Sequence, residues 1–226
     1  LLFFTACRDE QPPVAATETD EQYSGGKNFT TFDRSENAFG IQGKNLSSAE
    51  DGYFVTGNAL FRNNWVTAPA SVQSLDGLGP LLNAISCGSC HNQGSAFTHH
   101  GHDISHGIND LLGRRNALPV QNLLWQDSYF WDGGVHNIDL IPLNPIQNPV
   151  EMDEDIAKLL DKLRANSEYP TLFKRAFGTT QITNQRFLQA MSQFMAMLIS
   201  ANSRYDQFMK GTVAFTDSEK AGFELF

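Results

Sequence analysis

Three cysteines occur in the 226-residue chain, and two of them form the run Cys87-Gly88-Ser89-Cys90-His91. A Cys-x-x-Cys-His run is typical of a c-type haem attachment site. The two thiols can form thioether bonds to the haem vinyl groups, and the adjacent histidine can then bind the iron as its proximal ligand. The pattern therefore predicts covalently bound haem c held by Cys87, Cys90 and His91.

Zinc binding is an alternative explanation for the same cysteines. His102 and His106 stand four residues apart, so together with Cys87 and Cys90 they approach a two-Cys-two-His pattern. The segment between them is rich in glycine and lacks a hairpin-and-helix pattern, and zinc would leave His91 without a role. A redox dithiol is a third explanation, but it would stand beside a βαβ pattern that this sequence lacks. Haem is therefore the favoured cofactor.

The elements that must position this site are predicted to be mostly helical. Apolar residues recur at helical spacing over 156–163, 170–177 and 187–199, whereas the strand signal is weak throughout. Three methionines on the last of these helices are typical of core filling (Met191, Met195 and Met197). Residues 92–150 are rich in Gly, Asn, Pro and aromatic side chains, which predicts long loops around a large planar cofactor.

Composition excludes some classes of partner. The formal net charge is −9 and no basic stretch is present, so nucleic acid is not an expected partner. Beyond the first residues there is no apolar run of about 18, so a membrane-spanning helix is not expected.

The N-terminal residues resemble the tail of an export signal, and Cys7 stands where a lipobox carries its lipid-bearing cysteine. The polar, acidic stretch that follows favours a flexible tether. We expect residues 1–30 to comprise a truncated export or lipoprotein signal and a tether, which predicts a periplasmic protein whose membrane contact is limited to a lipid anchor. The alternative is a short apolar strand with a buried free cysteine.

The C-terminal residues predict a helix. Thr216-Asp217-Ser218-Glu219 has the form of a capping box, and the apolar residues Phe223, Leu225 and Phe226 follow it. Because this helix has only begun when the sequence stops, we expect more of the protein to follow.

Five short motifs between Ile85 and Met152 resemble those of the bacterial di-haem cytochrome c peroxidases. In order they are residues 86–91, 104–107, 112–116, 130–134 and 148–152. Two upstream segments, residues 57–66 and 76–80, instead resemble a related group of di-haem oxidoreductases. The resemblance implies a mostly α fold, with a cytochrome c-like haem domain with long loops over residues 31–165. It also implies that residues 166–226 begin a second helical cytochrome c-like domain, whose own haem lies beyond residue 226.

The resemblance also implies roles for residues near the haem. His91 is the proximal ligand, and His106 matches a distal histidine that caps the peroxidatic haem iron at rest. The residues alone fit a surface histidine at position 106 equally well, and His99, His100 and His102 lie in the same loop as substitutes. Glu151 matches the acid/base residue beside the peroxide. From the sequence alone, a Glu at a helix N-terminus that interacts with the helix dipole fits this position equally well.

Further roles follow from the same resemblance. Trp131 matches a tryptophan that relays electrons between the two haems, the alternative being a core aromatic residue. Asn116 matches a calcium ligand, for which an amide oxygen is suited. Arg114 and Arg115 are expected to contact the haem propionates. In the family a glutamine assists in the peroxide pocket. The corresponding position in this sequence falls near Ile141, so that glutamine is missing here.

The leading functional hypothesis is an enzyme. It is a periplasmic peroxidase that reduces hydrogen peroxide to water with electrons from a small cytochrome c or a cupredoxin, and a homodimer is compatible with it. One alternative is an electron-transfer cytochrome c in which the Met152 sulfur binds the iron and closes it to peroxide. A second alternative is a di-haem oxidase that acts on another substrate.

Overall fold

The computed structural model describes residues 35, 38–43, 46–64, 86–99 and 103–226. Within this described part, one compact unit ends at Ser200 and a second comprises Ala201–Phe226. The expected signal and tether of residues 1–30 lie outside the described residues. The expected boundary between two haem domains, at residues 165 and 166, stays a prediction.

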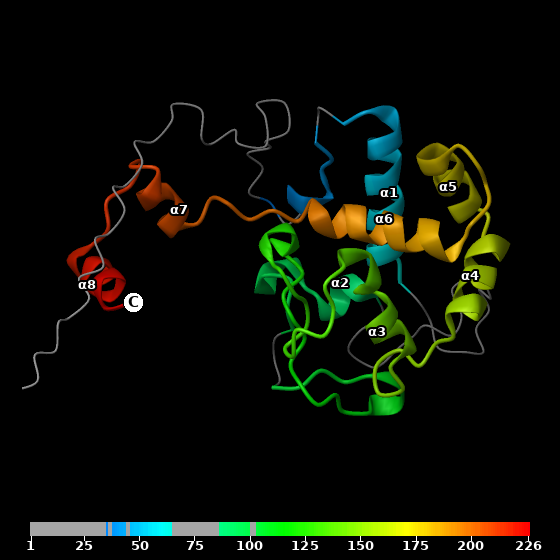
Figure 1. Ribbon diagram of the computed structural model, residues 1–226, viewed down its shortest axis with the longest axis horizontal. Coiled ribbons are helices and arrows are strands. Elements are labelled where there is room, and N and C mark those ends of the chain that lie inside the picture. Colours follow the sequence, from blue (N-terminus) through cyan, green and yellow to red (C-terminus); the bar gives the residue numbers. More distant parts are fainter. Residues whose placement is uncertain (1–34, 36–37, 44–45, 65–85, 100–102) are drawn as a thin grey trace, which may run out of the picture. The chain divides into compact units, whose positions relative to one another are not determined.

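Helices dominate the first unit, and the described residues form isolated β-bridges but no β-strand. The helices are α1 (Ser48–Arg62), α2 (Cys87–Cys90), α3 (Leu143–Gln147), α4 (Ile156–Ala165), α5 (Tyr169–Phe177) and α6 (Asn184–Ala196). The expected mostly α fold is therefore confirmed, and Figure 1 shows the order of these helices along the chain.

Helix α1 is not among the helices expected from apolar spacing, because Gly52 and Gly57 interrupt its pattern. A capping box begins it: the Ser47 hydroxyl accepts from the Glu50 N–H, and the Glu50 carboxylate accepts from the Ser47 N–H at 2.8 Å. The Ser-x-x-Glu spacing was the sequence signal that could have located this helix.

The glycines of α1 allow close packing against α5 and α6, as both ribbon views show. A Cβ at Gly52 would lie 2.6 Å from the Ala176 Cα, and one at Gly57 would lie 2.1 Å from the Ala190 carbonyl oxygen. Helices that approach so closely bury large apolar side chains around the crossing, which stabilises the layer. The buried residues of this helical layer include Phe54, Leu60, Phe61, Phe173, Phe187, Phe194 and Leu198.

The helices expected from apolar spacing form with identifiable caps. Asp155 accepts from the Ala157 and Lys158 N–H groups at the start of α4, and Thr183 caps α6. Gly178 ends α5 in the left-handed region with φ +71°. Met191 and Met195 are 5% and 3% exposed, so they fill the core as expected.

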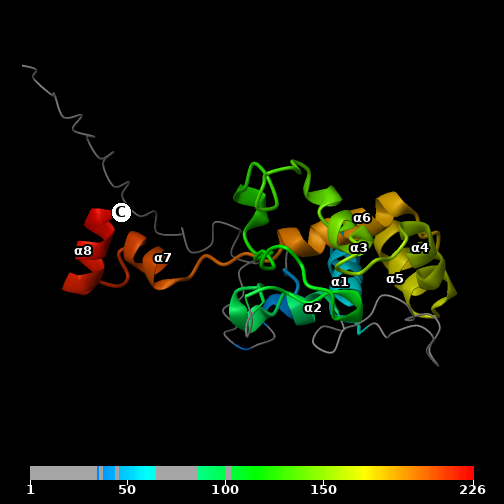
Figure 2. The same ribbon diagram turned by 90° about the horizontal axis from the view of Figure 1, so that it is seen from below.

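The described segments between Ser86 and Asp155 consist of tight turns and short helices, drawn mostly in green in Figures 1 and 2. Three isolated antiparallel bridges close these turns, namely Asn92 with Thr98, His106 with Leu112 and Tyr129 with Val135. Several non-glycine residues take positive φ in them: Ala96, Phe97, Asn109, Asp110, Asn122, Phe130 and Asp153. We call residues 86–154 the loop region.

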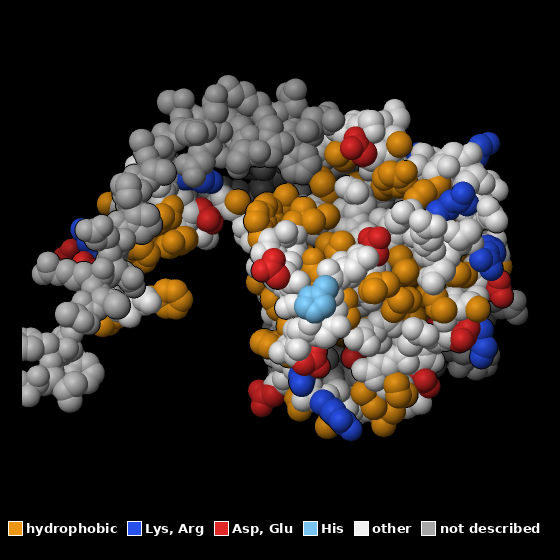
Figure 3. Space-filling model, in the orientation of Figure 1, with side chains coloured by type: hydrophobic (Ala, Val, Ile, Leu, Met, Phe, Trp, Pro, Cys, Tyr) orange, Lys and Arg blue, Asp and Glu red, His pale blue; other side chains and the backbone are white. Residues whose placement is uncertain are grey.

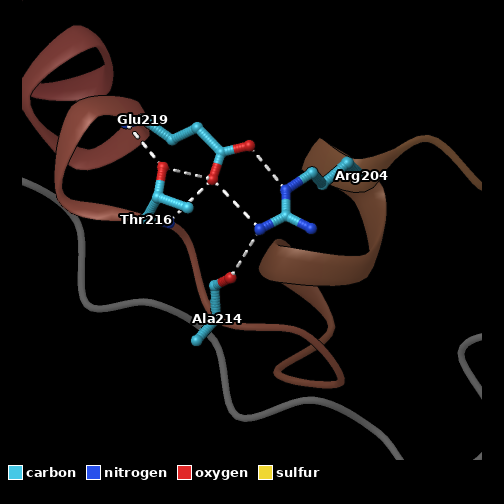
Figure 4. A network of polar contacts seen from close by, with 4 residues as sticks. All are labelled: Arg204, Ala214, Thr216 and Glu219. Atoms are coloured by element: carbon cyan, nitrogen blue, oxygen red, sulfur yellow. Dashed lines mark hydrogen bonds and ion pairs between the residues drawn. The ribbon is translucent and has the colours of Figure 1, made fainter.

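The second unit contains α7 (Arg204–Met209) and α8 (Asp217–Leu225). The predicted capping box begins α8, where the Thr216 hydroxyl accepts from the Glu219 N–H. Figure 4 shows the Glu219 carboxylate also accepting from Thr216 and from the Arg204 guanidinium, with a 2.5 Å contact to Arg204 Nε. Phe208 and Phe215 stack with ring centroids 3.7 Å apart.

Charged side chains of both signs are interspersed with apolar ones on the face drawn in Figure 3. No helix in the part of the chain that the structure describes is long and apolar enough to cross a membrane.

Candidate haem-binding site

Helix α2 is a single turn that presents both cysteines of the motif. Ser86 and Ser89 form a reciprocal cap, in which each hydroxyl accepts from the backbone N–H of the other residue at 3.1 and 2.8 Å. The His91 N–H then donates to the Cys87 carbonyl at 2.7 Å and completes the turn. Residues three apart lie on the same face of a helix, so Cys87 and Cys90 are presented together.

The imidazole of His91 is oriented by the backbone. Its Nδ1 lies 3.0 Å from the Phe97 carbonyl oxygen, which can only accept, so Nδ1–H donates and the lone pair is on Nε2. Burial lowers the pKa of His91, although hydrogen bonds to the Phe97 and Leu118 backbone oppose that effect. Burial thus favours the neutral ring that can bind iron, and the hydrogen bond of Nδ1 fixes the orientation of the ligand nitrogen.

The two thiols have strongly raised pKa values. Burial raises the pKa of Cys87 to about 12, with a smaller effect from the charge of Cys90. Burial also raises the pKa of Cys90 to about 11, with the Glu151 charge as the second cause. A redox dithiol needs a readily formed thiolate, so these environments disfavour that alternative.

Aromatic side chains surround the attachment turn. The Phe61 ring lies beside His91 with centroids 6.4 Å apart, and a Cβ at Gly88 would lie 3.4 Å from the same ring. Phe97 is 2% exposed, and Tyr169 is fully buried with its hydroxyl accepting from Asn63 at 2.9 Å. Two thiols, one oriented neutral imidazole and an aromatic lining fit a covalently attached haem.

His106 stands on a short hairpin. It bridges to Leu112, while the Gly113 N–H donates to the Ser105 carbonyl at 3.0 Å and the Gly107 N–H donates to the Leu111 carbonyl at 2.7 Å. We call residues 105–113 the histidine hairpin. It holds the His106 backbone in a defined place within the loop region.

The histidine hairpin is joined to the turn that carries Glu151. The Ile108 N–H donates to the Glu151 carbonyl at 2.7 Å. Gly107 lies against the same turn so closely that a Cβ there would be 1.7 Å from the Val150 carbonyl oxygen. Two candidate residues far apart in sequence, His106 and Glu151, are therefore carried by segments in direct contact.

Glu151 is held by Asn148. The Asn148 amide donates to Glu151 Oε1 at 2.7 Å, and the Glu151 N–H donates to the Asn148 carbonyl at 2.9 Å. Desolvation by the surrounding protein raises the pKa of Glu151, and the Asn148 hydrogen bond opposes it. Helix α4 begins only at Ile156 and is capped by Asp155, so the alternative of a Glu at a helix N-terminus is wrong.

A surface depression lies beside this turn. Its lining includes Asn148, which also holds Glu151, together with Val135, Leu140, Leu143, Asn144, Gln147 and Pro149. The Glu151 turn therefore borders a hollow that water and small solutes can enter.

Trp131 and Asn116 lie together on the surface. The Trp131 side chain is 61% exposed, so the alternative of a core aromatic residue is wrong. Its indole N–H donates to the Asn116 carbonyl at 3.0 Å. Arg115 pairs with Asp132 at 3.2 Å, and Arg114 is exposed. The roles expected for these residues at a second haem, a calcium ion and the haem propionates stay predictions.

Some of the alternative metal ligands considered from the sequence lie among the described residues and some do not. His99 lies within hydrogen-bonding distance of Ser105, at 3.1 Å, and Met152 packs against the hydrophobic core. His100 and His102 lie outside the described residues, and with His102 the zinc alternative does too. Among the side chains that are described, no group of three or more His, Cys, Asp or Glu is placed to hold a metal ion.

Several contacts of the site were not predicted from the sequence. Asp110 contacts His106, Asn148 holds Glu151, and backbone carbonyls of the loop region orient His91. Only Asn148 carried a signal, because it belongs to the same short motif as Glu151.

The fold and the site define a c-type cytochrome domain that is mostly helical with long loops. The family model of the di-haem cytochrome c peroxidases matches residues 81–214. The chain therefore belongs to this family. The model of the di-haem oxidoreductases matches residues 18–100, in agreement with the upstream resemblance.

Individual relatives support this membership. The chain is 29% identical over 143 residues to the methylamine utilization protein MauG of Methylophilus methylotrophus, and 32% identical over 144 residues to the cytochrome c551 peroxidase of Nitrosomonas europaea. Each comparison covers 63% of this chain and 42% of the relative. A solved structure of a MauG-like protein associated with microbial copper homeostasis matches with a TM-score of 0.64 and 28% identity, over 77% of this chain and 48% of that one.

The chain thus spans about two fifths of the length of these curated relatives. Membership of a di-haem cytochrome c family implies covalently bound haem c, and the residues around Cys87, Cys90 and His91 fit it.

Proposed function

We propose that the protein is a cytochrome c peroxidase that reduces hydrogen peroxide to water, with the haem of Cys87, Cys90 and His91 as the peroxidatic centre. The observation that carries this proposal is the contact between the histidine hairpin and the Glu151 turn, through Ile108 and Gly107. A histidine and a carboxylate are thereby held in one neighbourhood. The influence of Glu151 on the pKa of Cys90 indicates that this neighbourhood adjoins the haem attachment turn.

The overall reaction consumes two electrons and two protons for each peroxide, breaks the O–O bond and yields two water molecules. Haem c, when bound, supplies the iron that holds peroxide and the electrons that reduce it. The protein must move a proton from one peroxide oxygen to the other, so that the second oxygen leaves as water. Glu151 suits this role because its side chain is exposed to solutes, and partial desolvation raises its pKa, which favours uptake of a proton that the carboxyl group can then donate.

Asn148 orients the Glu151 carboxyl group for proton transfer. One carboxylate oxygen accepts from the Asn148 amide at 2.7 Å, which fixes the orientation of the carboxyl group. The depression that Asn148 also lines gives small solutes access to the turn that carries this carboxyl group. In the same scheme His106 would be the distal histidine that holds the iron in the resting protein and is released on activation.

The remaining parts of the proposal concern electrons and structure. Trp131 relays electrons from a second haem in the rest of the protein, with its indole fixed by Asn116. Arg114 and Arg115 contact the haem propionates, and Asn116 contributes to a calcium site. The electron donor is a small cytochrome c or a cupredoxin. The protein works in the periplasm, tethered through Cys7, and forms a homodimer.

The decisive experiment compares Glu151→Gln with wild type in the full-length, haem-loaded protein. Because a positioned acid/base group contributes roughly 10²–10⁴-fold, kcat/KM for hydrogen peroxide should fall by that factor. Haem content and absorption should be unchanged. The matched control is Glu224→Gln, which removes an exposed carboxylate in α8.

Other outcomes would point to the alternatives. An absorption band of methionine sulfur bound to iron, lost in Met152→Leu, together with no reaction with peroxide, would indicate an electron carrier. Glu151→Gln activity equal to wild type would remove the acid/base role. A peroxide reaction without reduction by a cytochrome or cupredoxin would indicate an oxidase acting on another substrate.

A further inference from the structure

His106 forms a close pair with an acidic residue of its own hairpin. Its Nδ1 lies 2.5 Å from Oδ1 of Asp110. A carboxylate can only accept, so the hydrogen of this contact is on Nδ1, and Nε2 is the nitrogen through which the ring would bind iron. Nothing in the proposed roles of His106 requires this carboxylate.

The position of Asp110 is set by the turn of the hairpin. Asn109 and Asp110 both take positive φ, at +54° and +61°, and the Leu111 N–H donates to the Ile108 carbonyl at 3.1 Å. Two consecutive left-handed residues and this hydrogen bond are the features of a type I′ turn, which Asn and Asp tolerate well. The turn returns the chain toward His106 and so brings the carboxylate to its ring.

The two side chains differ in exposure. That of Asp110 is 61% exposed and that of His106 is 25% exposed, so the carboxylate approaches the ring from the solvent side. The hairpin itself is fixed to the Glu151 turn through Ile108 and Gly107. The pair is therefore held on a backbone that is anchored independently of it.

We propose that Asp110 is a positioning residue, which holds the His106 ring with its lone pair on Nε2 and strengthens that nitrogen as an iron ligand. Metal-binding histidines commonly donate their second N–H to a carboxylate, which fixes the ring and makes the ligand more basic. The inference rests on the proposed function, in which His106 caps the iron at rest. It adds a residue that determines how firmly the cap is held.

The test uses the full-length, haem-loaded protein with Asp110→Asn, because asparagine tolerates positive φ and preserves the shape of the turn. Azide is titrated against the distal ligand of the resting protein, and the low-spin electron paramagnetic resonance signal is recorded. Loss of a carboxylate partner typically weakens metal binding by about 10–100-fold. In Asp110→Asn, azide should therefore displace the distal ligand at a concentration about 10- to 100-fold lower than in wild type. The g-values of the low-spin signal should also shift.

Two further variants make the result specific. Asp103→Asn removes another exposed carboxylate of the same segment and should behave as wild type. His106→Ala should abolish the low-spin signal of this haem, which identifies the signal that Asp110 is expected to modify. Hydrogen exchange at the Ile108 and Leu111 amides reports whether the hairpin remains closed.

Each other outcome has a distinct meaning. If His106→Ala changes the signal but Asp110→Asn matches wild type in azide affinity and g-values, the positioning role is wrong while the proposed function stands. If His106→Ala leaves the signal unchanged, the distal role itself is wrong. Loss of amide protection in Asp110→Asn would show that the pair holds the hairpin rather than the ring, which would also overturn the inference.

Discussion

The helical layer of α1, α5 and α6 and the loop region of residues 86–154 belong to one compact unit but are stabilised differently. The layer is held by fully buried apolar side chains such as Phe54, Phe173 and Phe194. The loop region depends on backbone hydrogen bonds, left-handed residues and a few buried anchors such as Phe97. All the candidate site residues lie in the loop region, so the chemistry is placed where local polar contacts decide the geometry.

A few polar contacts join the loop region to the segment that directly follows α6. The Asn122 N–H donates to the Leu198 carbonyl at 2.8 Å. The Asn122 side chain donates to the Ser200 carbonyl and accepts from the Ser200 N–H, at 2.9 and 2.7 Å. Such contacts set the position of a loop without requiring regular structure in it. The helical layer can therefore act as a rigid support for turns that carry functional side chains.

The largest expected effect is loss of the cofactor from the loop region, while the helical layer keeps its structure. The double variant Cys87→Ser, Cys90→Ser should lose all covalently attached haem, because no thioether can form. The helical layer buries its own core, so far-ultraviolet circular dichroism should retain most of the helical signal. Haem staining after denaturing electrophoresis measures the first effect.

Cys7→Ser is the matched control, since the third cysteine lies outside the attachment motif. Haem that survives denaturation in the double variant would contradict the assignment of the motif. Loss of the helical signal would show that the layer depends on haem, and the contrast between the two regions would not hold.

Gly57→Ala should produce the largest loss of stability within the helical layer. Its Cβ would lie 2.1 Å from the Ala190 carbonyl oxygen and 2.6 Å from the Phe194 Cβ, so α1 and α6 must separate. Overpacking of this kind costs about 3 kcal/mol, which corresponds to roughly 10 °C in the melting temperature. Thermal unfolding followed by circular dichroism measures it.

Gly222→Ala is the control for Gly57→Ala, because a Cβ at Gly222 meets nothing within 4 Å. Alanine is the better helix former by roughly 1 kcal/mol, so this variant should be as stable as wild type or more stable. A Gly57→Ala protein that melts at the wild-type temperature would mean that α1 and α6 do not pack as described.

Gly107→Ala introduces a similar clash in the loop region but should have only a local effect. Its Cβ would lie 1.7 Å from the Val150 carbonyl oxygen, so the histidine hairpin must move off the Glu151 turn. A local cost of about 1–3 kcal/mol raises hydrogen exchange at the Ile108 amide by roughly 10- to 100-fold. The melting temperature should change by only a few degrees, and peroxide turnover should fall.

The contrast between Gly57→Ala and Gly107→Ala is the sharpest test of the comparison. If Gly107→Ala lowered the melting temperature as much as Gly57→Ala, the loop region would be part of the cooperative core. The Leu159 amide, in α4, is the internal reference for hydrogen exchange and should not change in Gly107→Ala.

The smallest expected effect lies in the second unit. Hydrogen bonds from Arg204 and Thr216 lower the pKa of Glu219 to about 2. A carboxyl group with a lowered pKa contributes its stability above its ordinary pKa and loses it as pH falls toward the lowered value. Helix content in α8 should therefore decline slightly between about pH 4 and pH 2 in wild type.

Glu219→Gln retains a side chain that can complete the capping box but removes the charge that Arg204 pairs with. Its circular dichroism should accordingly be flatter over the same acid range. Glu224→Gln, also in α8, should keep the wild-type dependence. Equal pH dependence in all three proteins would show that the Arg204 contact contributes nothing measurable.

Much of the fold was predictable because its signals are local. The spacing of apolar residues located α4, α5 and α6, and the capping box at Thr216 located the start of α8. Helix α1 was not found, because Gly52 and Gly57 serve a close approach to other helices that spacing cannot reveal. The role of a glycine in such a crossing depends on its neighbours in space.

The candidate site shows the same division. Cys87, Cys90 and His91 lie within five residues of one another, so a single helical turn is enough to bring the haem-attachment residues together. The contact of the histidine hairpin with the Glu151 turn is a tertiary property. So is the raised pKa of Glu151, since desolvation depends on everything that surrounds the carboxyl group.

The sequence by itself determined the haem attachment motif, the helices with regular apolar spacing and the membership of a di-haem family. The attachment motif and the helices depend on residues that are close together in the chain, and family membership depends on short motifs that follow one another in a fixed order. Only the tertiary structure decided that Trp131 is exposed, that Glu151 is not at a helix end and that Asp110 contacts His106. Exposure and desolvation arise when distant segments pack, and the contact of Asp110 with His106 depends on the conformation of the hairpin turn between them, so the sequence pattern did not reveal them.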